Sequence, residues 1–189
     1  MKIKDNMLLF HGSYAAVENI DLSMCMEGKD FGSGFYLTSS KVQAKGFIRT
    51  SLLKAQRIGN ASLNQNFGYV SSFRYTGGDL EVFEFKDADR EWLWFIAQNR
   101  RPYLAKRLAG KVNPKAFRAD VVIGKVTNDK TNPTITAYLN GLYGDVLSER
   151  AVSFAIEELL PNQLEDQYCF RTENAVACLS FQEVRRYVI

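Results

Sequence analysis

The sequence predicts one α+β domain with a mainly antiparallel sheet, and three observations support this prediction. Its 189 residues are a usual length for a single domain, and a content of 46% hydrophobic and 13% aromatic residues indicates a folded core. Strand-like and helix-like segments do not alternate strictly, which disfavours a doubly wound parallel sheet. No repeat, low-complexity tract or Pro- and Ser-rich linker divides the chain. We therefore expect one domain over residues 1–189.

Runs rich in β-branched and aromatic residues predict seven strands. They cover residues 7–11, 34–38, 69–75, 80–85, 119–126, 167–172 and 181–189. Helical spacing of apolar residues predicts three helices, at 40–58, 89–99 and 148–160. Ser40, Asp89 and Ser148 stand at the starts of these segments, where their side-chain oxygens can cap the first turn.

The composition disfavours a membrane protein and a metalloprotein. No apolar run approaches the roughly 18 to 20 residues of a spanning helix, and the apolar stretch in MKIKDNMLLFHGS is too short for a signal peptide. We therefore expect a cytoplasmic protein with no membrane partner. Cys25, Cys169 and Cys178 form no CxxC pair, so we expect free thiols. One histidine and scattered thiols lack the ligand spacings of a zinc site, so no metal is expected.

Charge is unevenly distributed, although the formal net charge is only +3. Residues 100–118 carry seven Lys and Arg and no acidic residue. Such a run is most often a solvated surface, but it can also bind nucleic acid or another acidic target. Both interpretations stay open.

The only histidine of the chain, His11, is followed directly by Gly12 and Ser13. A lone histidine beside a strand is usually a buried structural residue, and one imidazole forms no acid–base dyad. Gly32 and Gly34 precede another strand-like run and can be simple turn residues, since a dinucleotide fingerprint would need a third glycine and a following helix. Together, a strand ending in His-Gly-Ser and a glycine-led strand with an aromatic face can hold a planar amide beside a ribose.

These segments resemble the three-motif plan of ADP-ribosyltransferases, in the subgroup with a His-Tyr-Glu signature. More narrowly, five motifs between residues 8 and 184 resemble a bacterial family of ADP-ribosyltransferase-like proteins whose genes often lie beside genes for small antitoxins. The motifs are LLFHGS, DFGSGFYLTSSKVQA, WLWFIAQNR, DVVIGKVTND and DQYCFRTENA. The resemblance implies an ADP-ribosyltransferase-like fold of two packed, mainly antiparallel sheets with flanking helices, and NAD as co-substrate.

The resemblance also implies roles for the first two motifs. His11 would hydrogen-bond the adenine-side ribose, and the backbone of Gly12 would hold the nicotinamide amide. Ser13 and Gly34 would lie beside them in the NAD site. Tyr36, with Phe47 eleven residues later, would flank the nicotinamide ring by offset stacking, although each aromatic alone is more typical of a core.

The third motif departs from the pattern of the subgroup. Where relatives have a glutamate that bonds the nicotinamide ribose and stabilises its developing positive charge, this chain has Gln167. The implied catalytic set is therefore His11, Tyr36 and Gln167. Glutamine can orient a ribose hydroxyl but supplies no negative charge.

Other charged residues in the motifs have no clear mechanism. Glu165 shares a face with Gln167 if the strand has begun by then, and otherwise it is a loop charge like Asp166. We expect Arg100, Asp120 and Asp129 to be structural.

The predicted function is a mono-ADP-ribosyltransferase that cleaves NAD at the nicotinamide bond and transfers ADP-ribose to a protein or nucleic acid. The resemblance implies a toxin of a toxin–antitoxin or phage-defence pair, with a small antitoxin protein as a partner. Two alternatives remain: an NAD- or ADP-ribose-binding module with weak or lost catalysis, and an interaction domain that binds no nucleotide.

Overall fold

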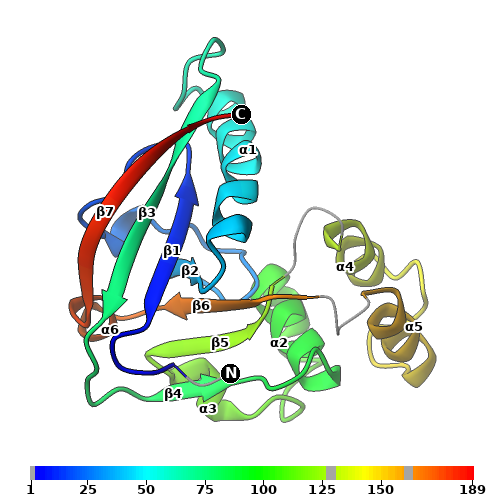
Figure 1. Ribbon diagram of the computed structural model, residues 1–189. Helices are drawn as coiled ribbons and strands as arrows, with labels where there is room; N and C mark the ends of the chain where they lie inside the picture. The colour runs from blue at the N-terminus through cyan, green and yellow to red at the C-terminus, as the bar shows by residue number, and fades with distance from the viewer. Residues whose placement is uncertain (1–2, 127–130, 160–163) are drawn as a thin grey trace.

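The chain folds into one seven-stranded mixed sheet with its main helices on one face (Figure 1). The computed structural model describes residues 3–126, 131–159 and 164–189. The strand order is β4-β5-β6-β2-β1-β3-β7, and every neighbouring pair is antiparallel except β4 and β5. The strands are β1 (Leu8–Ser13), β2 (Phe35–Thr38), β3 (Phe67–Tyr75), β4 (Val82–Glu84), β5 (Val121–Lys125), β6 (Asp166–Phe170) and β7 (Leu179–Val188). All seven predicted strands, and the mainly antiparallel α+β class, are confirmed.

The described strands belong to one continuous sheet, and the second packed sheet that we expected is not among them. The two halves of this sheet meet where β1 and β2 share a single register pair, Phe10 with Thr38. Figure 1 shows β1, β3 and β7 running steeply across the direction of β4, β5 and β6. Strong twist at this junction therefore separates the halves, while hydrogen bonding still joins them.

The three predicted helices are present with the predicted caps. They are α1 (Lys41–Arg57), α2 (Arg90–Arg100) and α5 (Glu149–Leu159). Ser40 accepts a hydrogen bond from Gln43 N, Asp89 from Trp92 N and Ser148 from Ala151 N. The last residue of the predicted third helix, 160, lies outside the described residues.

Three short helices and two 3-10 turns were not predicted. They are α3 (Pro114–Arg118), α4 (Asn132–Leu139), α6 (Glu173–Ala177), η1 (Leu22–Met24) and η2 (Pro102–Leu104). Within the described ranges, no helix is long and apolar enough to cross a membrane.

The two faces of the sheet are covered differently. On one face, which we call the helix face, α1 packs on β1 and β3, while α2 lies over the β5 and β6 half. The opposite face, which we call the loop face, is covered by apolar residues of the N-terminal segment 3–25 and by α6. Each face has its own buried cluster, so β2 and β6 in the middle of the sheet are buried on both sides.

Gly12 lets α1 approach β1 more closely than any other residue would allow. A Cβ atom at Gly12 would lie 1.8 Å from the carbonyl oxygen of Ala44, which is backbone and cannot rotate away. The first turns of α1 are therefore held directly against the end of β1.

We expect Gly12→Ala to destabilise the fold by about 3 kcal/mol or more, because helix and strand must separate to admit the methyl group. Gly46→Ala is the matched control, since Gly46 is exposed on the same helix and a Cβ there meets nothing within 4 Å. That control should stabilise the protein by about 1 kcal/mol. Urea unfolding measures both, and equal stability of Gly12→Ala and the parent would contradict the close approach.

Candidate functional site

Three neighbouring strands in the middle of the sheet carry His11, Tyr36 and Gln167, on β1, β2 and β6 respectively. Beyond the Phe10–Thr38 pair, β1 and β2 diverge, and no further register pair joins these two described strands. We call the region between the end of β1 and the start of β2 the β1–β2 gap. The candidate site is built around this gap.

The His11 ring bridges the gap. Its Nδ1 atom lies 2.8 Å from the carbonyl oxygen of Tyr36, and its ring centroid lies 4.6 Å from that of Phe35. Because a carbonyl oxygen can only accept, Nδ1 must carry the proton and donate it to Tyr36. The imidazole therefore replaces the backbone pairing that β1 and β2 lack at this point.

His11 is neutral at physiological pH. Burial lowers its pKa from 6.5 to about 4; the hydrogen bond to Tyr36 opposes this shift, and the nearby positive charge of Lys29 adds to it. In the neutral ring with Nδ1 protonated, Nε2 is an acceptor. His11 can thus receive a hydrogen bond from a hydroxyl donor such as a ribose.

Gly12 presents backbone groups to the same gap. Tyr75 N donates to Met7 O, so alternation along β1 directs the backbone groups of His11 toward β3 and those of Gly12 toward β2. The pairing with β2 ends at Phe10, before it reaches Gly12. A planar amide fits such a strand edge, because it both donates and accepts.

The hydroxyl of Tyr36 is held by the loop that precedes β2. It donates to Gly32 O at 2.7 Å and accepts from Phe31 N at 3.0 Å. Burial raises the pKa of this hydroxyl well above its usual value, so it remains protonated. The ring orientation is therefore fixed by backbone contacts, and the hydroxyl is fully engaged in structure.

Gln167 carries a buried donor without a partner. The residue is 7% exposed, and its Nε2 has no hydrogen-bond partner among the described residues. It pairs in register with Thr38 on β2 and Gly124 on β5. An unsatisfied buried donor costs about 1 to 3 kcal/mol, so an acceptor supplied by a ligand would be favourable there.

Alternation along the strands places these side chains on two faces of the sheet. Residues directly opposite one another share a face, so Gln167, Thr38 and Phe10 lie on the helix face, and Tyr36 joins them two residues from Thr38. His11, next to Phe10, projects to the loop face, as does Ser13. His11 and Gln167 are therefore on opposite faces of the sheet, which the sequence motifs did not reveal.

The other predicted ligand residues have ordinary structural contacts. Ser13 is buried and its hydroxyl accepts from Ala15 N at 3.4 Å. A Cβ at Gly34 would meet Cys169 Sγ at 2.6 Å, so this glycine allows close packing of β2 on β6. Phe47 is 45% exposed on α1, with the Lys54 ammonium 6.0 Å from its ring centroid. None of the described ring contacts joins Phe47 to Tyr36 or His11.

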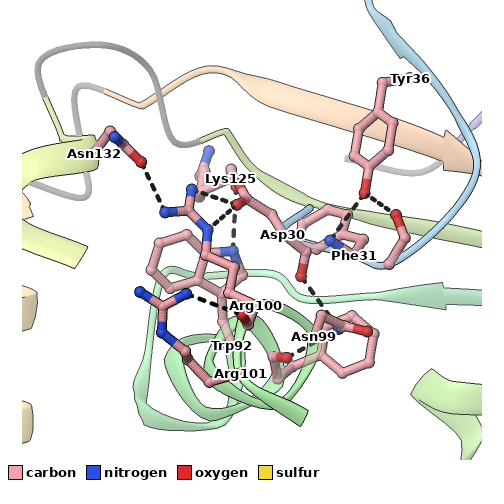
Figure 2. Close-up of polar contacts among 11 residues, drawn as sticks. Asp30, Phe31, Tyr36, Trp92, Asn99, Arg100, Arg101, Lys125 and Asn132 are labelled. Carbon is pink, nitrogen blue, oxygen red and sulfur yellow. Dashed lines mark hydrogen bonds and ion pairs between the residues drawn. The ribbon is translucent and has the colours of Figure 1, made fainter. Parts of the chain in front are cut away.

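A buried ion pair anchors the loop before β2, and the sequence did not indicate it. Arg100 on α2 binds the Asp30 carboxylate through Nε and Nη2, at 2.6 and 2.5 Å (Figure 2). Asn99 donates to the Asp30 carbonyl at 3.2 Å, and Arg100 also donates to Asn132. Arg100 is therefore structural, as expected, and it fixes the segment that holds the Tyr36 hydroxyl.

The remaining charged residues lie outside the gap. Asp120 accepts from Glu81 N and from the Thr172 hydroxyl, so it is structural as expected, whereas Asp129 lies outside the described residues. Glu165 is exposed just before β6, and Asp166 pairs with Lys125 at 2.9 Å.

The basic run 100–118 begins with the last residue of α2, Arg100, and continues as η2, turns and α3 on the surface. It is anchored by buried apolar residues at a spacing of four: Leu104, Leu108, Val112 and Ala116. Most of its cationic residues are exposed, and Arg107 pairs with Asp145 at 2.5 Å.

Comparison with known proteins identifies the family. A family model described as a protein of unknown function (DUF3990) matches residues 7–181, so the chain belongs to this family. No curated protein and no solved structure matches the chain. The matched range covers β1 through the first residues of β7 and therefore contains the whole β1–β2 gap.

We expect the His11 ring to titrate with a pKa of about 4 and to carry its proton on Nδ1 at neutral pH. The unfolded chain takes up a second proton on this imidazole near pH 6.5, whereas the folded protein takes it up only near pH 4. This contribution to stability is therefore constant above about pH 6.5 and is lost as the pH falls from 6.5 to 4.

Two measurements test this expectation. NMR follows the titration of the imidazole directly, because the chain has only one histidine. Urea unfolding at several pH values measures its contribution to stability. His11→Asn should remove the resonance and flatten the pH dependence between 6.5 and 4. A ring that titrates near 6.5 would show that His11 is solvated.

Proposed function

We propose that this protein is a mono-ADP-ribosyltransferase that binds NAD through the β1–β2 gap. It would cleave the bond between nicotinamide and ribose and transfer one ADP-ribose to a protein or nucleic acid. The observation that carries the proposal is the buried, unpartnered Nε2 of Gln167 on β6, next to the strand that borders the gap. The proposal includes an ADP-ribosyltransferase-like fold, which the resemblance of the motifs supports.

Each end of NAD has a suitable group at the gap. The neutral His11 offers Nε2 as an acceptor for a hydroxyl of the adenine-side ribose. The N–H and C=O of Gly12 suit the nicotinamide amide, with Ser13 and Gly34 beside it. Tyr36 would stack on the nicotinamide ring, and Phe47 would join it after a movement of its exposed side chain. Because His11 and Gln167 project to opposite faces, the dinucleotide could contact both only if the His11–Tyr36 hydrogen bond opened and β1 and β2 moved apart on binding.

In the reaction, the bond between C1′ and the nicotinamide nitrogen breaks, and its electron pair stays with nicotinamide. The ribose becomes oxocarbenium-like until a nucleophile of the acceptor attacks C1′ and loses its proton. Gln167 Nε2 would donate to a ribose oxygen and hold the ring in place. The amide supplies orientation but no negative charge, which favours a single transfer over chain elongation.

The neutral Gln167 also favours one alternative, a module that binds NAD or ADP-ribose with weak or lost catalysis. The resemblance to a family encoded beside small antitoxins supports the role of a cytoplasmic toxin with an antitoxin partner. Incubation with NAD labelled in the adenylate part and a cell lysate tests the enzyme. Protease or nuclease treatment of the product then identifies the acceptor. Binding of NAD without nicotinamide release would favour the module.

We expect His11→Ala and Tyr36→Ala each to weaken NAD binding at least tenfold, because each removes a wall of the gap. Tyr36→Phe keeps the stacking ring and should bind NAD within about threefold of the parent, since the hydroxyl contacts the loop and Cys169. Tyr103→Ala is the exposed control. Isothermal titration calorimetry measures the NAD affinity of the four variants and of the parent. Equal affinities of the parent, His11→Ala and Tyr36→Ala would refute the site.

We expect Gln167→Ala to lower nicotinamide release on the order of 10²-fold, the usual loss for one transition-state contact. Gln167→Glu should keep or raise the rate, because a carboxylate can bond the ribose and stabilise its positive charge. Both rates are measured as the release of free nicotinamide at saturating NAD. Full activity of Gln167→Ala would remove Gln167 from the mechanism and make exposed Glu165 the next residue to test.

A further inference from the structure

An exposed cation lies at the Tyr36 side of the β1–β2 gap. The ammonium of Lys29 is 5.3 Å from the centroid of the Tyr36 ring. Its positive charge also acts to lower the pKa of His11 and of Cys169. Among the ion pairs of the described residues, none involves Lys29. The next residue, Asp30, is committed to Arg100 and holds the backbone of this segment in place.

We propose that Lys29 binds the diphosphate of NAD; this inference rests on the proposed function. In the dinucleotide, the diphosphate connects the adenine-side ribose to the nicotinamide-side ribose. If His11 bonds the first ribose and Tyr36 stacks on nicotinamide, the diphosphate must pass between them. Lys29 is the exposed cation that lies over the Tyr36 ring, at the nicotinamide end of this path.

The position of Lys29 over Tyr36 suits an exchange of cations on binding. Lys29 contributes a cation–π contact to the Tyr36 ring. The pyridinium ring of NAD is itself cationic and would take the same contact, so the ammonium must leave. The flexible lysine stem allows it to turn toward the two phosphates, where a charge-assisted hydrogen bond is stronger than a cation–π contact at an exposed site.

The test compares three ligands that differ in the diphosphate: NAD, ADP-ribose and nicotinamide. Lys29→Ala should weaken binding of NAD and ADP-ribose by about tenfold. Binding of nicotinamide should be unchanged or slightly tighter, because the Tyr36 ring is released from the ammonium. Lys29→Arg should restore most of the affinity for the two diphosphates. Lys86→Ala, at an exposed lysine beside the edge strand β4, should bind all three ligands like the parent.

Salt provides a second measurement on the same proteins. Affinity of the parent for ADP-ribose should fall as ionic strength rises, and the fall should be smaller in Lys29→Ala. Unchanged affinity of Lys29→Ala for both diphosphate ligands would overturn the inference while leaving the NAD site intact. An equal loss for nicotinamide would also overturn it, by showing a general distortion. A parent that binds no NAD would overturn the proposed function itself.

Discussion

The buried ion pair between Asp30 and Arg100 connects the sheet to α2 and determines where the second motif lies. Both side chains are largely buried, so the cost of removing them from water offsets much of their mutual attraction. Such a pair therefore contributes mainly by fixing where the two segments lie relative to each other. It fixes the backbone of residues 30–32, and Phe31 N and Gly32 O in turn hold the Tyr36 hydroxyl. Losing one partner would leave the other buried without this counter-charge and would loosen the start of β2.

A second consequence follows for the junction between β1 and β2. With β2 held by its loop on one side and by β6 on the other, β1 pairs with it only at Phe10. At the next position, the His11 side chain donates a hydrogen bond to the backbone of β2. In a regular strand pair, a backbone group would make this contact. The ring is neutral because it is buried, and its Nδ1 proton is committed, so its remaining chemistry is to accept a hydrogen bond at Nε2.

The sequence predicted the strands well because each contains β-branched or aromatic residues and is bounded by glycine, polar or charged residues. Helices α3 and α6 are five residues long, too short to show a periodic apolar face, although Asn113-Pro114 and Thr172 are recognisable starts. The β-branched residues of α4 conceal its helical spacing. Motifs placed His11, Tyr36 and Gln167 near one another, but they could not reveal the register that sends His11 to the loop face. The Asp30–Arg100 pair joins residues seventy positions apart, and charge alone does not show burial.

The charges at the gap bear on how well the proposed reaction can proceed. His11 and Gln167 are neutral, and Lys29 adds one positive charge over the Tyr36 ring. The nearest carboxylate on β6, Asp166, is paired with Lys125. Such a site is suited to a ligand with a negative diphosphate, and it holds the ribose by orientation. It offers little to a positive charge developing on that ribose, because the neutral Gln167 stands where the related motif has a glutamate. We therefore expect the site to bind NAD well but to cleave it slowly, and we expect the rate to depend strongly on the nucleophilicity of the acceptor.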